Sequence, residues 1–321
     1  MAGAIAGTAI LNCELCNTLH TVALTINNSC NLRCPHCYLQ YDGPNDSITP
    51  HVLSLLSSST FRHLAIVGKE PLVNSKSVNI CVDLALASRS LGRTVSLITN
   101  GTNLSTLVGS QAHLFSWIDV SFDGGPSTYK AYRRGQYHSV IDAVRKLATI
   151  GYDHINALHV LNDRTVRELD DLMHVSEDAT FQTIMFSPYL VTMNDGHNTV
   201  RPVSLIDILS RLRRCAPFMN NDSALLLIDC FHLDAENLSA SMFAQTTDAM
   251  NMRHKVKIIA DDPIAYGIIR LTYDGLALPP SDSLHPAQYA KNGSPISTAN
   301  TVELQDVFQE QLRRHTRLHA N

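Results

Sequence analysis

"TVALTINNSCNLRCPHC", residues 21–37, joins a short apolar run to three cysteines within eight positions. Residues 21–26 are rich in β-branched side chains and predict a strand. Cys30, Cys34 and Cys37 follow this strand directly. Three thiols so close together leave three alternatives: a disulfide pair with a spare thiol, a zinc site, or an open iron–sulfur site.

The composition is that of an ordinary globular protein. The chain has 321 residues, 45% of them hydrophobic, and a net charge of −4, which suits one large α/β domain or about two domains. The opening "MAGAIAG" lacks a basic segment, and no apolar run approaches the roughly 20 residues of a spanning helix. We expect a cytoplasmic protein with no membrane partner. The short "RLRR" at 211–214 is typical of a solvated helix face, so nucleic acid is not an expected partner.

The cysteines are too sparse for a secreted disulfide scaffold. They stand at positions 13, 16, 30, 34, 37, 81, 215 and 230. A closed zinc site needs four ligands, often as two pairs, whereas the trio has spacings of four and three. Three cysteines on one loop can hold three irons of a four-iron cluster and leave the fourth open. His36, between Cys34 and Cys37, is the residue that would complete a zinc site instead.

Strands and helices alternate along the first two thirds of the chain. The predicted strands are 21–26, 63–68, 94–99, 117–122, 155–160 and 180–186. The predicted helices are 50–58, 76–90, 103–114, 137–150 and 163–175. This alternation predicts an α/β fold with a parallel sheet and crossover helices. Because there are six units rather than the eight of a closed barrel, we expect a partial (β/α)6 barrel.

Polar or glycine-rich segments follow each of the first four predicted strands. The cysteine loop follows the first, "VGKEPL" (67–72) the second, "TNG" (99–101) the third and "SFDGG" (121–125) the fourth. In open parallel sheets ligands bind at the carboxyl ends of strands. Taken alone, "TNG" and "SFDGG" are good turns, but together with the cysteines they predict a cofactor site at this edge.

"CNLRCPHC", "GKEP", "TNG" and "SFDG", in this order, resemble the radical S-adenosylmethionine (SAM) superfamily over roughly residues 20–190. The resemblance implies a 4Fe-4S cluster and SAM as cofactors. It also implies an enzyme that cleaves SAM reductively to a 5′-deoxyadenosyl radical, which removes hydrogen from a substrate. The segment 270–296 resembles the auxiliary-cluster (SPASM/twitch) domain of some relatives without its cysteines.

The resemblance also implies roles for single residues. Cys30, Cys34 and Cys37 would bind the cluster, and the ring of His36 would lie near the adenine of SAM. The other positions that it places near SAM are Gly68, Lys69, Glu70, Asn100, Ser121 and Arg134. The first three match a GGEP stretch that binds the SAM amino group, and Asn100 and Ser121 match positions near its methionyl or ribose groups. Arg134 is the candidate for the carboxylate. Lys69 replaces the second glycine of that stretch, which affects how closely the backbone can approach a ligand.

The remaining cysteines and histidines have weaker patterns. Cys81 lies in an apolar helical stretch and is expected in the core. Cys13 and Cys16 form a CxxC pair, which is typical of a redox motif or half of a metal site. With Cys215 and Cys230 this pair could hold an auxiliary cluster, but no cysteine follows position 230, so we expect one cluster only. The histidines at 154, 159, 174, 197 and 232 have no metal spacing and are expected to be structural.

The chain is predicted to divide into an N-terminal extension (1–20), a barrel (21–195) and a small α+β cap (196–321) that closes the barrel and contacts substrate. In the cap we expect a helix at 203–216, strands at 224–229, 255–260 and 266–272, and a final helix at 303–318. Tyr266, Tyr273 and Asp274 are candidates for lining the site.

The substrate is the least determined part of the prediction. Only about 20 residues precede the first strand, too few for the leader-binding domain of roughly 80 residues that peptide maturases often carry. We therefore expect a small metabolite, a sugar or nucleoside, with a peptide as the alternative and a non-catalytic metal-binding protein as a second alternative. Epimerisation, elimination, decarboxylation or carbon–carbon coupling would need no external electron sink. Candidate catalytic residues are Cys215, Cys230 and Tyr273, and the expected electron donor is a flavodoxin or ferredoxin.

Overall fold

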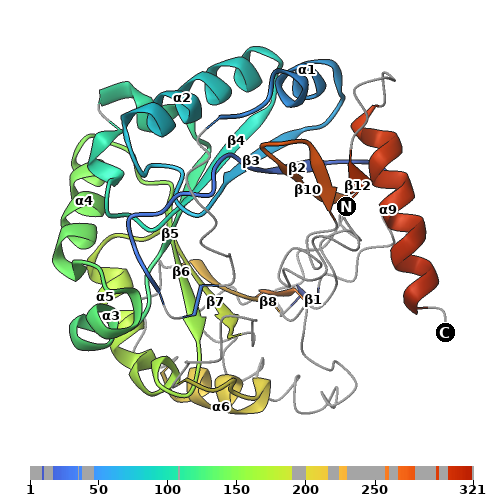
Figure 1. Ribbon diagram of the computed structural model, residues 1–321. Helices are drawn as coiled ribbons and strands as arrows, with labels where there is room; N and C mark the ends of the chain where they lie inside the picture. Colours follow the sequence, from blue (N-terminus) through green and yellow to red (C-terminus); the bar gives the residue numbers. More distant parts are fainter. Residues whose placement is uncertain are drawn as a thin grey trace, which may run out of the picture.

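The chain forms one curved sheet with its helices on the outside (Figure 1). The computed structural model describes residues 9–10, 17–34, 36–37, 47–107, 109–189, 200–215, 224–229, 257–259, 267–278, 294–295 and 303–319. Within them the strand order is β1-β9-β8-β7-β6-β5-β4-β3-β2-β10-β11-β12. The strands are β1 (Ala9–Ile10), β2 (Thr21–Thr25), β3 (His63–Val67), β4 (Thr94–Thr99), β5 (Trp117–Ser121), β6 (Ile155–Leu161), β7 (Thr183–Pro188), β8 (Ala224–Asp229), β9 (Lys257–Ile259), β10 (Ile268–Thr272), β11 (Leu276–Leu278) and β12 (Ser294–Pro295).

The six predicted barrel strands are confirmed as β2 to β7. Each pairs in parallel with the next, in sequence order. A parallel pair needs a crossover between its strands, and helices or helical turns occupy these connections. The α/β partial barrel expected from the sequence is therefore the observed fold.

The helices lie close to where the sequence placed them. They are α1 (Pro50–Ser58), α2 (Ser75–Ser90), α3 (Pro126–Arg133), α4 (Tyr137–Thr149), α5 (Leu169–Asp178), α6 (Leu205–Cys215) and α9 (Leu304–His319). Local capping explains two of the starts. The side chain of Thr49 accepts the N–H of Val52 at 3.4 Å, and Asn74 Oδ1 accepts the N–H of Ser77 at 2.9 Å. Both bonds satisfy donors that a helix start leaves open.

Two segments differ from the predicted helices. The segment expected as one helix at 103–114 forms two short 3-10 turns, Leu104–Thr106 and Gly109–Leu114. Gly109 has a φ of 55°, in the left-handed region, so a right-handed helix cannot run through it. Conversely, α3 was not predicted. It starts at Pro126, a residue preorganised for the first helical turn, and ends at Arg134 in the left-handed conformation.

The C-terminal strands lengthen the barrel sheet at both of its edges. β8 pairs in parallel with β7, and β9 with β8. At the other edge β10 pairs in parallel with β2, and β11 and β12 follow in antiparallel order. This covers the unpaired N–H and C=O groups of β2 and β7, which an open sheet would expose. The sheet thus continues past residue 196, while the two predicted domain boundaries remain predictions.

The hydrophobic core fills the space between the sheet and the outer helices. From the strands it includes Val22, Leu24, Leu64, Ile66, Val95, Leu97, Ile118 and Val120, and from the helices Val52, Leu55, Val78, Leu84, Val140 and Val144. Because side chains alternate along a strand, the residues between these face the inside of the curved sheet. Ser121 and Asp123 near the carboxyl end of β5 belong to this inner set.

A hydrogen-bonded polar layer lies near the amino ends of the central strands. His63 binds Thr94 Oγ1 at 2.8 Å and Ser96 Oγ at 2.9 Å through its two ring nitrogens, and stacks on Trp117 at 4.5 Å. Asp119 accepts bonds from the ring N–H of Trp117 and the amide of Asn156. These groups have their polar partners within the protein.

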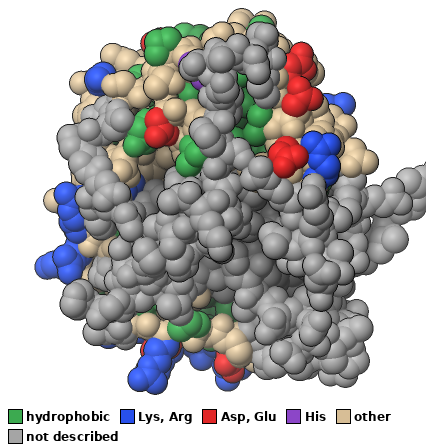
Figure 2. Space-filling view, turned by 45° about the vertical axis from the view of Figure 1, so that its right-hand side comes forward, with side chains coloured by type: hydrophobic (Ala, Val, Ile, Leu, Met, Phe, Trp, Pro, Cys, Tyr) green, Lys and Arg blue, Asp and Glu red, His purple; other side chains and the backbone are tan. Residues whose placement is uncertain are grey.

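The surface has no strong sign of a charged partner. On the face shown in Figure 2, the Lys and Arg side chains of the described residues lie in separate places and form no basic stripe. This agrees with the net charge of −4. Among the helices that the structure describes, none combines the length and the apolar run required to cross a bilayer.

His63 and Asp119 have opposite effects on stability as pH changes. Burial lowers the pKa of His63 to about 4, so its contribution to stability is complete above pH 6.5 and is lost as pH falls toward 4. Burial raises the pKa of Asp119 to about 6, so its contribution is complete below pH 3.8 and is lost as pH rises toward 6. We expect Asp119→Asn to steepen the rise of unfolding free energy between about pH 4 and 6.5, and His63→Asn to flatten or reverse it. Urea unfolding of both variants and the wild type across this range measures the effect, and parallel curves for all three would contradict it.

Candidate functional site

The cysteine loop lies at the carboxyl end of β2, as the sequence predicted. Cys30, Cys34 and Cys37 are all free and half-buried. Within the loop the N–H of Cys37 donates to the carbonyl of Cys34 at 3.1 Å, and the N–H of Leu32 donates to Cys30 Sγ at 3.3 Å. The loop is therefore folded back on itself and not extended.

The environment of the thiols disfavours bare thiolates. Burial raises the pKa of Cys34 to about 12; the charge of Arg133 acts in the opposite direction, and the other two cysteines add to the rise. Burial also raises the pKa of Cys30, against which the N–H of Leu32 acts. Because the three thiols influence one another's pKa, they lie near one another. A metal centre would have to displace their protons on binding.

A single metal ion and a multi-iron cluster place different demands on the trio. A single zinc ion draws its sulfur ligands in to about 2.3 Å from one centre, whereas the sulfurs that ligate a four-iron cube bind three different irons. Among the described residues, no group of three or more His, Cys, Asp or Glu side chains is arranged to hold one ion. The zinc site completed by His36 stays an alternative prediction.

Glu70 is a buried carboxylate that joins the ends of two strands. It has no exposed surface. Its Oε1 accepts the hydroxyl of Thr99 at 2.6 Å and the N–H of Leu72 at 2.9 Å, and its Oε2 accepts the N–H of Asn100 at 2.6 Å. Burial raises the pKa of Glu70, against the effect of these three donors. The side chain that the resemblance placed near SAM therefore holds the strand ends β3 and β4 in place.

The backbone of Glu70 is bound to the start of the cysteine loop. Its N–H donates to the carbonyl of Ser29 at 3.0 Å, and its carbonyl accepts the amide of Asn27 at 2.8 Å. A Cβ at Gly68 would lie 2.6 Å from Asn27 Oδ1, closer than real contacts allow, so glycine permits this approach. Lys69, which stands between Gly68 and Glu70 in the sequence, is half-buried.

Asn100 ties the first half of the cysteine loop to the end of β4. Its amide nitrogen donates to Asn31 Oδ1 at 2.9 Å and lies 3.8 Å from Cys30 Sγ. Its Oδ1 accepts the N–H and the hydroxyl of Thr102 at 2.9 and 2.6 Å. The side chain of Asn100 thus contacts the loop that carries Cys30, and its place near SAM stays a prediction.

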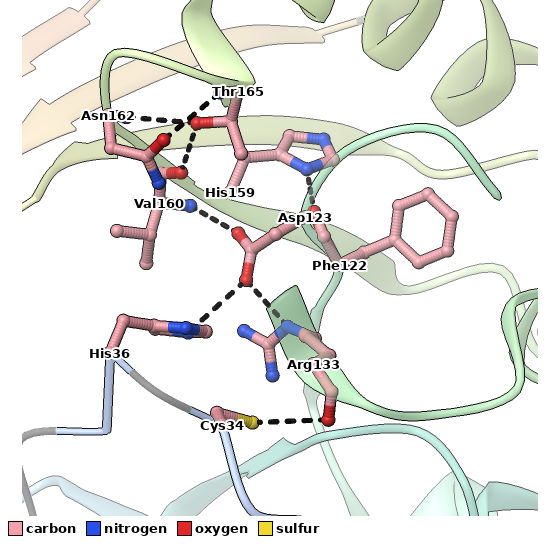
Figure 3. A network of polar contacts seen from close by, with 9 residues as sticks. All are labelled: Cys34, His36, Phe122, Asp123, Arg133, His159, Val160, Asn162 and Thr165. Atoms are coloured by element: carbon pink, nitrogen blue, oxygen red, sulfur yellow. Dashed lines mark hydrogen bonds and ion pairs between the residues drawn. The ribbon is translucent and has the colours of Figure 1, made fainter. Parts of the chain in front are cut away.

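A second group of residues contacts the other half of the loop (Figure 3). The ring of His36 stacks on Tyr132, with 3.8 Å between centroids and 7° between planes. His36 Nε2 lies 3.6 Å from Asp123 Oδ2, which also accepts Arg133 Nε at 2.5 Å. The Cys34 thiol lies 3.6 Å from the carbonyl of Arg133. Sequence reasoning missed Asp123, Tyr132 and Arg133, although "SFDGG" and "YRRG" contain them.

The two remaining cofactor candidates differ in position. Ser121 is half-buried at the end of β5, on the same side of the sheet as Asp123. Arg134 is exposed, with a φ of 57° just after α3, whereas its neighbour Arg133 is 7% exposed and belongs to the site. The helical spacing of Tyr129, Tyr132 and Arg133, all buried on α3, is the signal that would have distinguished the two arginines.

The structure describes only some of the residues predicted to be catalytic, to bind an auxiliary cluster or to line the site. Cys230, Cys13, Cys16 and Tyr266 lie outside the described residues, and Cys215 is the last residue of α6. Tyr273 is half-buried in the turn between β10 and β11, where its carbonyl accepts the N–H of Thr49 at 2.9 Å. The exposed Asp274, in the same turn, accepts the hydroxyl of Thr272 at 2.5 Å. Their catalytic or lining roles remain predictions.

Two structural predictions are confirmed. Cys81 has no exposed surface and donates to the carbonyl of Pro71 at 3.5 Å. His159 is also fully buried, with one ring nitrogen bonded to the carbonyl of Phe122 and the other 3.0 Å from Ser176 Oγ. Burial lowers the pKa of His159 to about 4, as for a neutral core histidine.

Comparison with known proteins points to one family. Residues 24–175 match the model of the radical SAM superfamily. The "Probable GTP 3′,8-cyclase" of Methanocaldococcus jannaschii is 23% identical over 196 residues, 58% of this chain and 65% of that protein. The "S-adenosylmethionine-dependent nucleotide dehydratase" of Flammeovirga pacifica is 28% identical over 134 residues, 37% of this chain and 43% of that protein. The chain thus spans less than two thirds of either relative.

Solved structures with the same fold include two with SAM bound. Streptococcus suis SuiB with S-adenosylmethionine superposes with a TM-score of 0.63 at 13% identity, covering 91% of this chain and 66% of SuiB. Native anSMEcpe with AdoMet gives a TM-score of 0.57 at 16% identity, covering 91% and 79%. At these identities the likeness is one of fold.

The Glu70 contacts can be tested by a single substitution. In Glu70→Gln the side-chain NH₂ group replaces one of the two carboxylate oxygens. It must then face either the N–H of Asn100 or the Thr99 and Leu72 donors, so at least one buried hydrogen bond is lost. We expect a loss of about 1–3 kcal/mol in the free energy of unfolding, measured by urea denaturation. Asp83→Asn, at an exposed position of α2, is the matched control and should stay within about 0.5 kcal/mol. Equal stability of Glu70→Gln and the control would show that the Glu70 bonds make no net contribution.

Proposed function

We propose, because residues 24–175 match the model of the radical SAM superfamily, that this chain is an enzyme that binds a 4Fe-4S cluster and SAM and acts on a small metabolite with a nucleoside or sugar part. The observation that carries the proposal is the half-buried trio Cys30, Cys34 and Cys37 at the carboxyl end of β2, in CxxxCxxC spacing.

The chain's own residues have distinct parts in this proposal. The bound cluster would supply one electron to SAM, so that its sulfonium bond breaks and a 5′-deoxyadenosyl radical forms. The three cysteines would hold the cluster, and Gly68 allows the close approach of Asn27, whose amide bonds the carbonyl of Glu70. The ring of His36, stacked on Tyr132, is the candidate contact for the nucleoside base.

We assign the SAM carboxylate to Arg133 in place of Arg134. Arg133 bonds Asp123 through Nε, and in Figure 3 its guanidinium lies between Asp123 and Cys34. Its carbonyl lies 3.6 Å from the Cys34 thiol, so the residue is close to the cluster loop. A planar guanidinium suits bidentate binding of a carboxylate.

The names of the two relatives support a nucleotide as the substrate class. One is a GTP cyclase and the other a nucleotide dehydratase by name. SuiB is known with a bound precursor peptide, but at 13% identity its likeness shows the fold alone. We therefore keep the peptide as the alternative substrate and propose the C-terminal residues from 196 onward as the part that contacts substrate.

The expected partners follow from the chemistry. A cluster that is reduced in each cycle needs a one-electron donor, for which a flavodoxin or ferredoxin is suited, and a reducing cytoplasm would keep the cysteines available for iron.

Anaerobic reconstitution with iron and sulfide tests the cofactors. We expect about four irons per chain and, after reduction with dithionite and addition of SAM, 5′-deoxyadenosine detectable by chromatography. Cys34→Ala should abolish this product, because it removes a cluster ligand. Cys81→Ala, which shortens a buried cysteine outside the loop, should retain it.

The same assay separates the substrate classes. Ribonucleoside triphosphates, nucleosides, sugar nucleotides and short peptides are added singly, and the rate of 5′-deoxyadenosine formation is compared with that of SAM alone. A nucleotide or nucleoside should give the largest increase. An increase with peptides only would establish a peptide as the substrate. About eight irons per chain would indicate an auxiliary cluster. Bound zinc without SAM cleavage would contradict the proposal that the chain is an enzyme.

A further inference from the structure

Asp123 is a fully buried carboxylate that contacts three different parts of the fold. It has no exposed surface. Its Oδ1 accepts the N–H of Val160 on β6 at 2.5 Å, and its Oδ2 accepts Arg133 Nε on α3 at 2.5 Å. The same Oδ2 lies 3.6 Å from His36 Nε2, on the cysteine loop. One side chain thus links a barrel strand, the helix after β5 and the predicted cluster loop (Figure 3).

The two halves of the cysteine loop are held from different sides. Ser29, Cys30 and Asn31 contact Glu70 and Asn100 at the ends of β3 and β4. Cys34 and His36 contact the last turn of α3. The contacts of the second half are separate from those of the first half, because they come from the end of β5 and from α3.

The second half of the loop contacts α3 and the end of β5 through two of its described residues. The Cys34 thiol lies 3.6 Å from the carbonyl of Arg133. The ring of His36 stacks on Tyr132 with 3.8 Å between centroids, and its Nε2 lies 3.6 Å from Asp123 Oδ2.

Asp123 in turn sets the position of Tyr132 through Arg133. The guanidinium is buried, and a buried charge is stable only when paired. Because Arg133 is the last residue of α3 and Arg134 leaves the helix in the left-handed conformation, the bond from Arg133 to Asp123 fixes the turn that carries Tyr132. The carboxylate is itself fixed by Val160 N–H on β6.

We propose that Asp123 is a positioning residue for the cofactor site: through Arg133, Tyr132 and its own approach to His36, it holds Cys34 and His36 in the arrangement that receives the cluster and the SAM nucleoside. The purpose of this positioning role rests on the proposed function. The ordered loop that the role requires is a property of the apoprotein, before any cofactor binds. The competing view is that the Asp123–Arg133 pair only stabilises the fold.

Hydrogen–deuterium exchange of the anaerobic apoprotein distinguishes the two views. In Asp123→Asn the amide oxygen can still accept Val160 N–H, but the charge that pairs with Arg133 is gone. We expect peptides spanning residues 30–37 and 126–134 to exchange about tenfold faster, which corresponds to about 1.4 kcal/mol of local opening free energy. Peptides from α2 and β4 should exchange as in the wild type.

Asp119→Asn is the matched control, because it also replaces a buried aspartate of β5 and its partners are Asn156 and Trp117. It should leave exchange in residues 30–37 unchanged. Faster exchange throughout the barrel in both variants would mean a general loss of stability and would overturn the proposal, as would unchanged exchange of the loop in Asp123→Asn.

Tyr132 supplies a second test that leaves no charge unpaired. Tyr132→Phe keeps a ring against His36 and should keep the loop ordered, whereas Tyr132→Leu removes the stack and should speed exchange in residues 34–37. Equal exchange in these two variants would show that the stack does not hold the loop.

The reconstituted protein provides a spectroscopic readout. We expect the electron paramagnetic resonance signal of the reduced cluster in Asp123→Asn to be broader than in the wild type and to change less on addition of SAM. A signal and a SAM response identical to the wild type would overturn the positioning role. If the wild type assembled no cluster, the proposed function would fail, while the exchange measurements would still decide the role of Asp123.

Discussion

Parallel pairing of β2, β3, β4 and β5 is the constraint on which the site depends. In this pairing Thr25 lies beside Val67, and Thr99 beside Val120, so all four strands end at the same edge. The segments that follow them are therefore neighbours although they are far apart in sequence. Cys34 and Arg133, which are in contact, are 99 positions apart. Without this arrangement the cysteine loop would have no protein groups beside it except its own.

Two buried carboxylates at this edge are stabilised in different ways. Glu70 accepts three bonds from neutral donors, and burial still raises its pKa. Asp123 is paired with the guanidinium of Arg133. Burial opposes the charged form of Arg133, but Asp123 with Cys34 and Tyr129 outweighs it, so that the pKa of Arg133 is raised. Either carboxylate would destabilise the fold if it were buried without partners. Both connect segments of the fold that lie beside the cysteine loop. The bonds of these two buried carboxylates therefore fix the positions of the strand ends and of α3 around the loop.

The predictions that failed did so where backbone conformation outweighs pattern. The segment 103–114 has helical spacing of apolar residues, yet Gly109 takes a left-handed φ and divides it into two turns. α3 is too short and too polar on one side to stand out by periodicity. Arg133 and Arg134 are the same residue type, and the end of α3 between them leaves one buried and the other exposed. The role expected for Arg134 stays untested.

The sequence by itself determined the six barrel strands, the order of the segments at their ends and the cysteine trio, because β-branched runs and ligand spacing are local properties. It also indicated which residues would gather at one edge, since parallel strands end together. Only the tertiary structure decided what those residues contact: that Glu70 and Asn100 hold strand ends and loop, that Arg133 faces inward, and that C-terminal strands complete both sheet edges. These outcomes depend on side-chain direction and on pairing between distant segments, for which no local pattern is sufficient.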